Sequence, residues 1–393
     1  TNSDSGFTAV AGEGYFLNTT AGTISVNLPA GSAGAVVAFK DYAGTFQTNN
    51  VTVVPNGSDK IGGSTTNATL STKGIAVTLI FIDSTQGWLV TDDGVQSSAD
   101  NNPYIVATGG TETESGNCKI HTFTGPGTFS VTKTATAAAD NVVSHLVVAG
   151  GGGTAGAAAG ESGSGGGGAG GYREVVSPSS PYTGSPLNGY PSAPNRITVT
   201  ATNFPITIGA GGAAGPTTGI ASDGGASIFS TITSAGGGGS AAKNQTARPG
   251  GSGAGGVANP DSPAPGNNPP TSPAQGTPGG PTGSTDNGGG GGGATAPGGS
   301  GTPGDGGDGG AGGTSSINGT PTARAGGGAG GAYNGNGGSG GAGGGGDGAH
   351  DADGTAGTVN TGGGAGGTGS NSPTVGNGAQ GGSGIVIIRY RFQ

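Results

Sequence analysis

Few residues in this sequence combine the types and the spacing that catalysis requires. The three histidines, His121, His145 and His350, lie far apart along the chain. Neither His121 nor His145 has a second ligand or a triad partner beside it, so a zinc site and a Ser-His-Asp triad both lack local support. The 21 Asp and Glu residues fall mostly in predicted turns and do not suggest the carboxylate pair that glycan hydrolysis needs. The sequence therefore predicts a protein that is not an enzyme and that has no metal or cofactor.

Three loops resemble ligand-binding motifs in part. Asp351-Ala-Asp-Gly354 and Gly304-Asp-Gly-Gly-Asp308 are like calcium loops, but they lack the EF-hand ligand set and its closing glutamate. Gly209-Ala-Gly-Gly-Ala-Ala-Gly215 follows an apolar strand as a dinucleotide fingerprint does, yet its last glycine is out of register and no amphipathic helix follows. With 99 glycines in 393 residues chance matches are expected, and we interpret these loops as turns.

Surface chemistry is the remaining possibility for side-chain function. Sequons of the form Asn-x-Ser/Thr are possible N-glycan acceptors in a glycosylating secretory pathway. They begin at Asn18, Asn50, Asn56, Asn67, Asn244 and Asn318. Tyrosines can stack on sugars through a flat apolar ring with a polar tip, and they can equally pack against glycine layers. The residues open to both interpretations are Tyr172, Tyr182, Tyr190 and Tyr333.

Composition excludes several classes of partner. Only 8% of residues are charged, the net charge is -9, and no basic cluster appears, so we expect neither nucleic acid nor a membrane surface as a partner. The longest strongly apolar run, Ile75 to Ile82, is far shorter than the roughly 20 residues of a membrane-spanning helix. Cys118 is the one cysteine and cannot form an intrachain disulfide. Methionine is absent and Thr1 to Phe7 lack an apolar leader, which leads us to expect a removed N-terminal segment and mildly favours export.

The elements that would position these residues are β-strands, and we predict an all-β fold with three domains. Residues 1–98 show short apolar runs separated by Pro- and Gly-containing turns, which is typical of a β-sandwich module. In Thr23 to Leu28 and in Ile75 to Ile82, apolar residues alternate so that one side of each strand faces a core, and Trp88 is the largest residue expected in it. Residues 99–235 form a second β-rich unit with glycine-rich insertions, in which strands run directly into glycine tracts.

Residues 236–393 are a glycine-rich region that ends in a C-terminal strand, Gly384 to Phe392. A flexible linker is one interpretation, because glycine brings no side chain to bury. Order is favoured because the tracts alternate with apolar strands and because a structureless loop of about 145 residues is rare. We therefore predict packed helices of the polyproline-II/polyglycine-II type, held by backbone hydrogen bonds between neighbours. Prolines interrupt the tracts between Asn259 and Pro281, where a solvent-exposed loop is the alternative.

Several segments of residues 1–98 resemble a repeat module of bacteriophage tail fibres. These are Gly14-Tyr-Phe-Leu-Asn18, Val37-Ala-Phe-Lys-Asp-Tyr42, Asn56-Gly-Ser-Asp-Lys-Ile61 and Gly87-Trp-Leu-Val90. The later part, with Ile206-Thr-Ile-Gly-Ala-Gly-Gly212 and Gly384-Ile-Val-Ile-Ile-Arg-Tyr390, is similar to glycine-rich domains of phage tail and bacterial surface proteins. The resemblance implies fibre architecture, self-association and attachment to a host surface, and it carries no catalytic residues.

Two functions follow as hypotheses, and both place the protein outside the cell, on a filament or on a virion. In the first, the chain is a structural subunit of a self-assembling fibre, and strand edges near its two ends complete a neighbour's sheet. The assembly residues in this hypothesis are Phe7, Val10, Ile385, Val386, Ile387, Ile388, Tyr390 and Phe392. In the alternative, the chain is a phage tail-fibre or adhesin component, a homotrimer by resemblance, that binds a cell-surface glycan.

Overall fold

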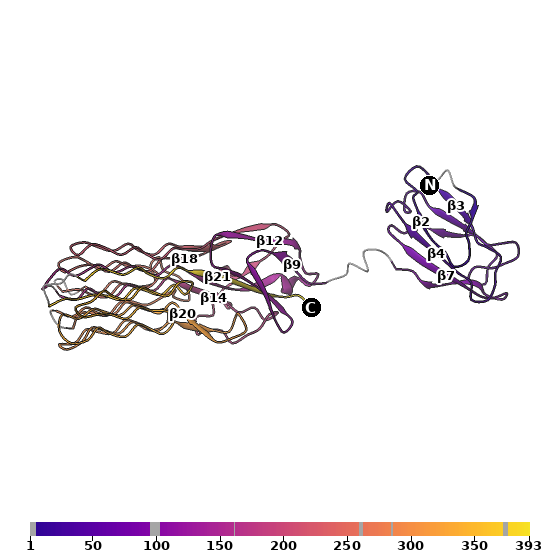
Figure 1. The fold of residues 1–393 in the computed structure, drawn as a ribbon. Helices are drawn as coiled ribbons and strands as arrows, with labels where there is room; N and C mark the ends of the chain where they lie inside the picture. The colour runs from indigo at the N-terminus through magenta and orange to yellow at the C-terminus, as the bar shows by residue number, and fades with distance from the viewer. Residues whose placement is uncertain (1–4, 95–102, 161, 259–261, 284–285, 372–375) are drawn as a thin grey trace. The chain divides into compact units, whose positions relative to one another are not determined.

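The computed structural model describes residues 5–94, 103–160, 162–258, 262–283, 286–371 and 376–393 (Figure 1). The chain forms two compact units, Thr1–Asn102 (unit 1) and Pro103–Gln393 (unit 2). The second and third predicted domains therefore belong to one compact unit. Helical structure in the described residues is confined to two 3-10 turns, Ala138–Asn141 and Ala193–Asn195, and no described helix could span a membrane. The predicted all-β class is confirmed.

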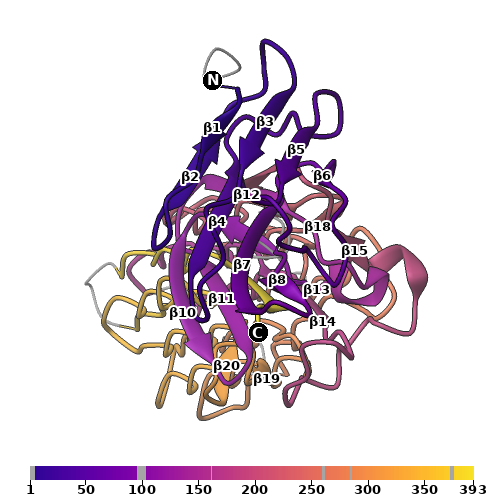
Figure 2. The same ribbon diagram turned by 90° about the vertical axis from the view of Figure 1, so that its right-hand side faces the viewer.

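Unit 1 consists of two four-stranded sheets (Figure 2). The first has the order β1-β3-β5-β6 and is formed by Phe7–Thr8, Ile24–Asn27, Val51–Val54 and Ala68–Leu70. The second has the order β2-β4-β7-β8 and is formed by Gly14–Leu17, Val36–Asp41, Ala76–Asp83 and Gly87–Asp92. The first sheet contains two parallel pairs, β1-β3 and β3-β5, and the second contains one, β2-β4.

A single side-chain core lies between these sheets. Buried and less buried residues alternate along β3, β4, β5 and β7, as the period of two in the sequence predicts. Trp88 is fully buried and packs edge-on against Phe81. The buried carboxylate of Asp41 accepts backbone N–H groups from Thr45, Phe46 and Gly74 at 3.1, 3.2 and 2.9 Å, which ties two loops to the end of β4.

Unit 2 begins with a second sandwich. One sheet has the order β18-β17-β16-β12-β9, formed by Ile232–Ser234, Ser227–Phe229, Asn203–Thr207, Gly127–Lys133 and Val106–Thr108. The other has the order β10-β11-β21-β13-β14, with β15 beside β13. Its strands are Thr111–Ser115, Cys118–Phe123, Ile385–Arg391, Val142–Val148, Tyr172–Val175 and Ile197–Thr198.

The sheet that contains β21 is buried on both faces. One face packs on the first sheet through Phe129, Phe229 and Tyr390, and the other packs on glycine-rich segments and on a hairpin of β19 (Gly313–Ser315) and β20 (Thr322–Arg324). This burial explains why β13 and β21 are almost continuously apolar rather than alternating. β21 pairs with β11 on one edge and with β13 on the other.

The glycine-rich segments extend from the strands of unit 2 and run side by side (Figure 1). The segment after β13, residues 149–158, leads away from the sheet, and residues 162–171 return to β14. Similar out-and-back pairs follow β16 and β18 and continue through residues 276–383. The turns that lie far from the sheets are 159–160, 216–219, 243–246, 303–305, 333–336 and 350–352; together we call them the loop end.

Backbone hydrogen bonds join these segments with a period of three residues. Along residues 163–171, successive N–H groups point in turn to three different neighbours. The first neighbour accepts through the carbonyls of Asp286, Gly289 and Gly292 from Gly163, Gly166 and Ala169, in that order. The second accepts through Thr368, Ala365 and Gly362 from Ser164, Gly167 and Gly170. The third accepts through Gly238 and Ala235 from Gly168 and Gly171. Carbonyls of the same segment accept N–H groups from three further segments, around residues 152, 252–255 and 328–331. This alternation is the one that threefold helices require, while the polyproline-II/polyglycine-II type itself stays a prediction.

Glycine is needed where the segments approach one another most closely. A Cβ atom on Gly167 would lie 2.3 Å from the Gly152 carbonyl oxygen, and one on Gly291 would lie 2.0 Å from the Gly167 carbonyl oxygen. Both distances are much shorter than a van der Waals contact. The neighbouring backbone, not a side chain, therefore selects glycine at these positions.

The proline-interrupted stretch is held by side chains in its described part, residues 262–281. Gln275 is fully buried, accepts the Ala235 N–H at 2.8 Å and donates to the Pro269 carbonyl at 2.7 Å. Asn195 donates to the Ser272 carbonyl at 2.8 Å. The stretch is therefore tied to the rest of unit 2, although Asn268 to Pro270 within it are exposed to solvent as the alternative expects. Residues 259–261 lie outside the described part of the chain.

Candidate functional site at the loop end of unit 2

The predicted assembly residues of the C-terminal strand lie inside the chain's own sheet. Ile385 to Ile388 and Tyr390 are buried, and Phe392 packs beside the same core. Strand completion in a neighbour requires a free edge, and β11 and β13 occupy both edges of β21. In this fold the strand closes unit 2 instead. At the other end of the chain, Phe7 belongs to the two-residue edge strand β1 and Val10 is 54% exposed, so their proposed role in assembly stays a prediction.

The histidines do not assemble into one site. His121 and Tyr390 share a hydrogen bond of 3.0 Å between Nε2 and the hydroxyl, and His121 Nδ1 lies 2.6 Å from the Gly109 carbonyl. His145 is buried on β13, which lies on the other side of β21, and there burial first and the positive charge of Arg173 second lower its pKa to about 3. Both are packing residues of the sandwich. His350 lies at the loop end, 3.6 Å from the Asp351 carboxylate.

The tyrosines and sequons are divided between core and surface. Tyr172 is buried, and its hydroxyl donates to Glu174 at 3.1 Å, so packing is the correct interpretation there. Tyr182 donates to the Val175 carbonyl at 3.3 Å, and Tyr190 stacks 4.4 Å from the Arg196 guanidinium. Among the predicted glycan acceptors, Asn56, Asn67 and Asn244 are exposed, whereas Asn18, Asn50 and Asn318 are half-buried.

A polar hollow of about 250 Å³ opens at the loop end. Its lining comes from four separate parts of the chain, namely the end of the segment after β13, residue 162, the turn after Gly215 and the turn after Ala242. The polar lining residues are Ser162, Thr217, Thr218, Lys243, Asn244 and Gln245. Ser162 is 4% exposed, and its hydroxyl has no hydrogen-bond partner, which is costly for a buried polar group.

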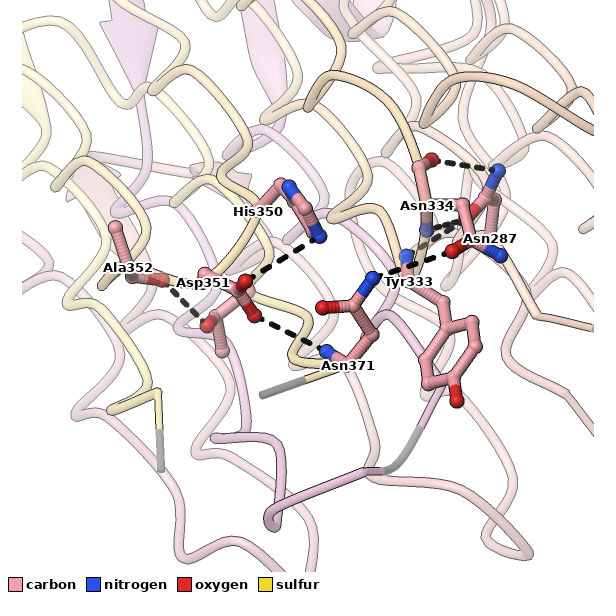
Figure 3. A network of polar contacts seen from close by, with 8 residues as sticks. Asn287, Tyr333, Asn334, His350, Asp351, Ala352 and Asn371 are labelled. Carbon is pink, nitrogen blue, oxygen red and sulfur yellow. Dashed lines mark hydrogen bonds and ion pairs between the residues drawn. The ribbon is translucent and has the colours of Figure 1, made fainter. Parts of the chain in front are cut away.

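A network of amides and carboxylates connects the other turns of the loop end (Figure 3). The buried Asn287 side chain accepts the backbone N–H of Tyr333 at 2.7 Å and that of Asn334 at 3.4 Å. Asn371 donates from its side chain to Asn334 Oδ1 at 3.2 Å and from its backbone to Asp351 Oδ1 at 3.0 Å. The Tyr333 ring points away from this network (Figure 3). The network fixes the turns relative to one another and leaves polar atoms at the surface.

Aspartates close the edges of the glycine-rich array. Asp305 Oδ1 accepts the Asn336 N–H at 2.9 Å, Asp308 Oδ1 accepts the Ser339 N–H at 2.7 Å, and Asp353 Oδ1 accepts the Asn377 N–H at 2.8 Å. Each carboxylate thus satisfies a backbone donor of the adjacent segment. In the calcium-like motifs these side chains act as structural caps, and within the described residues no group of three or more His, Cys, Asp or Glu side chains is placed to hold a metal ion.

Two family models match the sequence. A model described as a glycine-rich domain matches residues 122–391, and the N-terminal model of bacteriophage T4 gp9/10-like protein matches residues 1–117. The first match spans well over half of the chain, so this chain belongs to the glycine-rich domain family. A search of curated proteins gave no match. The pair of matches confirms the resemblance to a phage tail-fibre module followed by a glycine-rich domain, and it supports a structural phage component.

Proposed function

We propose that the chain is a non-enzymatic, virion-surface component of a phage tail fibre, whose glycine-rich unit presents its loop end to a cell-surface glycan. The observation that carries this proposal is the gathering of turns from separate parts of unit 2 at one end, beside a polar hollow. The N-terminal family match supplies the connection to a phage structure. In this proposal unit 1 connects to the rest of the fibre.

The glycine-rich segments act in the proposal as a stiff support of polyglycine-II helices. Three different neighbours for successive N–H groups, as along residues 163–171, mean that no segment can shift without breaking bonds in several directions. Such a support needs no side-chain core, and it holds the turns in fixed positions. Preorganised loops bind ligands with a smaller entropy cost than mobile ones.

The chemistry of the hollow fits a single sugar ring. Drug-sized ligands occupy pockets of roughly 300 to 1,000 Å³, so a volume of about 250 Å³ admits one monosaccharide unit of a longer glycan. Hydroxyl and amide side chains from Ser162, Thr217, Thr218 and Gln245 offer both donors and acceptors, which suits the hydroxyl groups of a sugar. The open side of the hollow leaves room for the remainder of the glycan.

Binding to an array of bacterial surface polysaccharides tests the proposal. We expect the chain to bind particular glycans, and we expect Gln245→Ala and Thr218→Val to weaken that binding at least tenfold without changing the melting temperature. Thr302→Val, next to the turn 303–305 of the loop end, is the matched control. Equal binding by wild type, both hollow variants and the control would rule out the hollow as the glycan site.

Self-assembly through strand edges is the second candidate. It now depends on the N-terminal edge, where β1 pairs with β3 alone and Phe7 and Val10 lie. Electron microscopy of the purified chain at rising concentration separates the two functions. Long filaments with a regular axial repeat would favour self-assembly, and discrete short particles would favour the phage component.

A further inference from the structure

Two arginines at the C-terminal end of β21 face a second hollow of unit 2. Arg389 and Arg391 are two residues apart on one strand, so both lie on the same face of the sheet. The hollow has a volume of about 540 Å³ and is lined by the turn between β10 and β11, by the loop around Ser179 and by both arginines. It belongs to the sandwich part of unit 2, and its lining residues differ from those of the polar hollow at the loop end.

Arg389 is a buried cation without a counter-ion in the described chain. It is 6% exposed. Its terminal nitrogens donate to the Ile317 carbonyl at 3.3 Å and to the Ser115 carbonyl at 3.5 Å, its guanidinium lies 5.7 Å from the Tyr182 ring, and its Nε has no partner. Neutral carbonyls and a ring face compensate a buried charge only partly. Arg391 is half-buried, donates from Nε to the Gln393 carbonyl at 3.1 Å and stacks 4.8 Å from Tyr104.

The carboxylates nearest in sequence or in the sheet are already engaged elsewhere. Glu112 and Glu114 alternate with Thr113 and Ser115 on β10, so they belong to the opposite face, where Glu112 pairs with Lys119 at 3.5 Å. The buried Glu174 accepts hydrogen bonds from Tyr172, Ser185 and Ser315. Within the described residues, no Asp or Glu side chain forms an ion pair with Arg389 or Arg391.

We propose that this hollow binds an oxyanion, the phosphate or carboxylate group of a ligand, through Arg389 and Arg391. Guanidinium groups bind both kinds of oxyanion in a bidentate manner, and an anion here would neutralise the buried charge of Arg389. The overall charge of the chain is -9, so non-specific attraction does not concentrate anions on this protein. The site goes beyond the proposed glycan binding and does not depend on it.

Calorimetric titration of the full chain with inorganic phosphate and, separately, with malonate tests the site at constant ionic strength. We expect saturable binding with a dissociation constant on the order of 1 mM for at least one of them. A phosphate-only response assigns the ligand group as a phosphate, and a malonate-only response assigns it as a carboxylate. Arg391→Gln is expected to weaken binding at least tenfold.

Matched variants separate a site from general electrostatics. Lys119→Gln removes the same charge from the opposite face of the sheet, and we expect it to leave binding unchanged. Arg389→Lys keeps the buried charge but loses the planar fork, and we expect weaker binding from a folded protein. Absence of saturable binding by either anion, or an equal loss in Lys119→Gln and Arg391→Gln, would overturn the proposal.

Discussion

The sandwich of unit 1 and the glycine-rich segments of unit 2 reach order by different means. In unit 1, side chains such as Phe46 and Trp88 fill the space between two sheets. In the glycine-rich segments, carbonyl and N–H groups of one segment fill the space beside the next, as where Gly291 meets the Gly167 carbonyl. Unit 1 requires large apolar side chains at its core positions, whereas the glycine-rich segments require glycine, which has no side chain, at their closest approaches. The two regions should therefore fail under different changes.

Low pH is expected to produce the largest difference in stability between the two units. The pKa of His145 is about 3 in folded unit 2 and about 6.5 in an unfolded chain. Below pH 6.5 His145 binds a proton in the unfolded chain but not in folded unit 2. The stability of unit 2 that is fully present above pH 6.5 is therefore lost as the pH falls towards 3. The loss is on the order of 5 kcal/mol. Burial also lowers the pKa of His121, which acts in the same direction.

Unit 1 contains no histidine and should keep its stability to lower pH. For Asp41, burial alone would raise the pKa, but the N–H groups of Gly74, Phe46 and Thr45 lower it on balance, so its contribution is lost only as the pH falls below about 4. Fluorescence of Trp88, the one tryptophan, follows unit 1, while circular dichroism follows both units. His145→Leu should flatten the acid loss of unit 2. Simultaneous unfolding of both units at pH 5 would contradict this prediction.

Removal of a core ring is expected to act on unit 1 alone. Phe46 is fully buried, and Phe46→Ala should destabilise unit 1 by about 3 to 5 kcal/mol through lost burial and a cavity. The melting transition seen by Trp88 fluorescence should fall, and the transition of unit 2 should not move. Phe16→Ala, at a position that is 75% exposed, is the control, with an expected change within about 0.5 kcal/mol.

Addition of one methyl group is expected to lower the stability of the glycine-rich region, whereas in unit 1 it is removal of a ring that lowers stability. Gly167→Ala places Cβ 2.3 Å from the Gly152 carbonyl oxygen and should destabilise unit 2 by about 1 to 3 kcal/mol. Gly304→Ala meets no atom within 4 Å and has no positive φ, so it serves as the matched control. Calorimetric melting of both variants measures the difference, and equal melting temperatures would argue against backbone packing.

The smallest expected effect concerns a cap at the edge of the array. Asp308→Ala removes the acceptor of the Ser339 N–H and should cost about 0.5 to 1.5 kcal/mol. Asp308→Asn retains an oxygen acceptor and should recover most of that loss. Hydrogen exchange of the Ser339 amide reports the cap directly, and unchanged protection in Asp308→Ala would show that the carboxylate is not needed.

The sequence predicted unit 1 best, because side-chain packing leaves a period of two in the residues. The expected strands of residues 14–90 and the burial of Trp88 were confirmed. In unit 2, the run Ser227 to Ala235 leads directly into a glycine tract, but it forms the hairpin β17-β18 rather than one strand. Ser230 adopts a positive φ of 54° at this turn, and the run contains no glycine or proline that would indicate a turn there. The glycine tracts indicated ordered packing. Hydrogen bonds between backbones do not depend on side-chain identity, so the sequence does not show which segments become neighbours.

The same reason limits prediction of the sites. The hollow at the loop end combines Ser162, Thr217 and Gln245, which only the array brings together. The C-terminal strand was expected to complete a neighbour's sheet, and the sequence could not indicate that β11 and β13 of the same chain pair with it. Arg389 and Arg391 carried a readable signal, since two cations at a spacing of two interrupt an otherwise apolar strand.

The central place of β21 also sets the time at which unit 2 can form. The strand lies between β11 and β13, and the bond from His121 to Tyr390 joins residues 269 positions apart. During synthesis the sheet lacks its middle strand until Ile385–Arg391 emerge, so unit 1 can fold early while unit 2 waits for β21. Contacts of such long separation also slow the search for the native pairing. The order of synthesis thus makes the emergence of β21 the step that commits unit 2 to its fold.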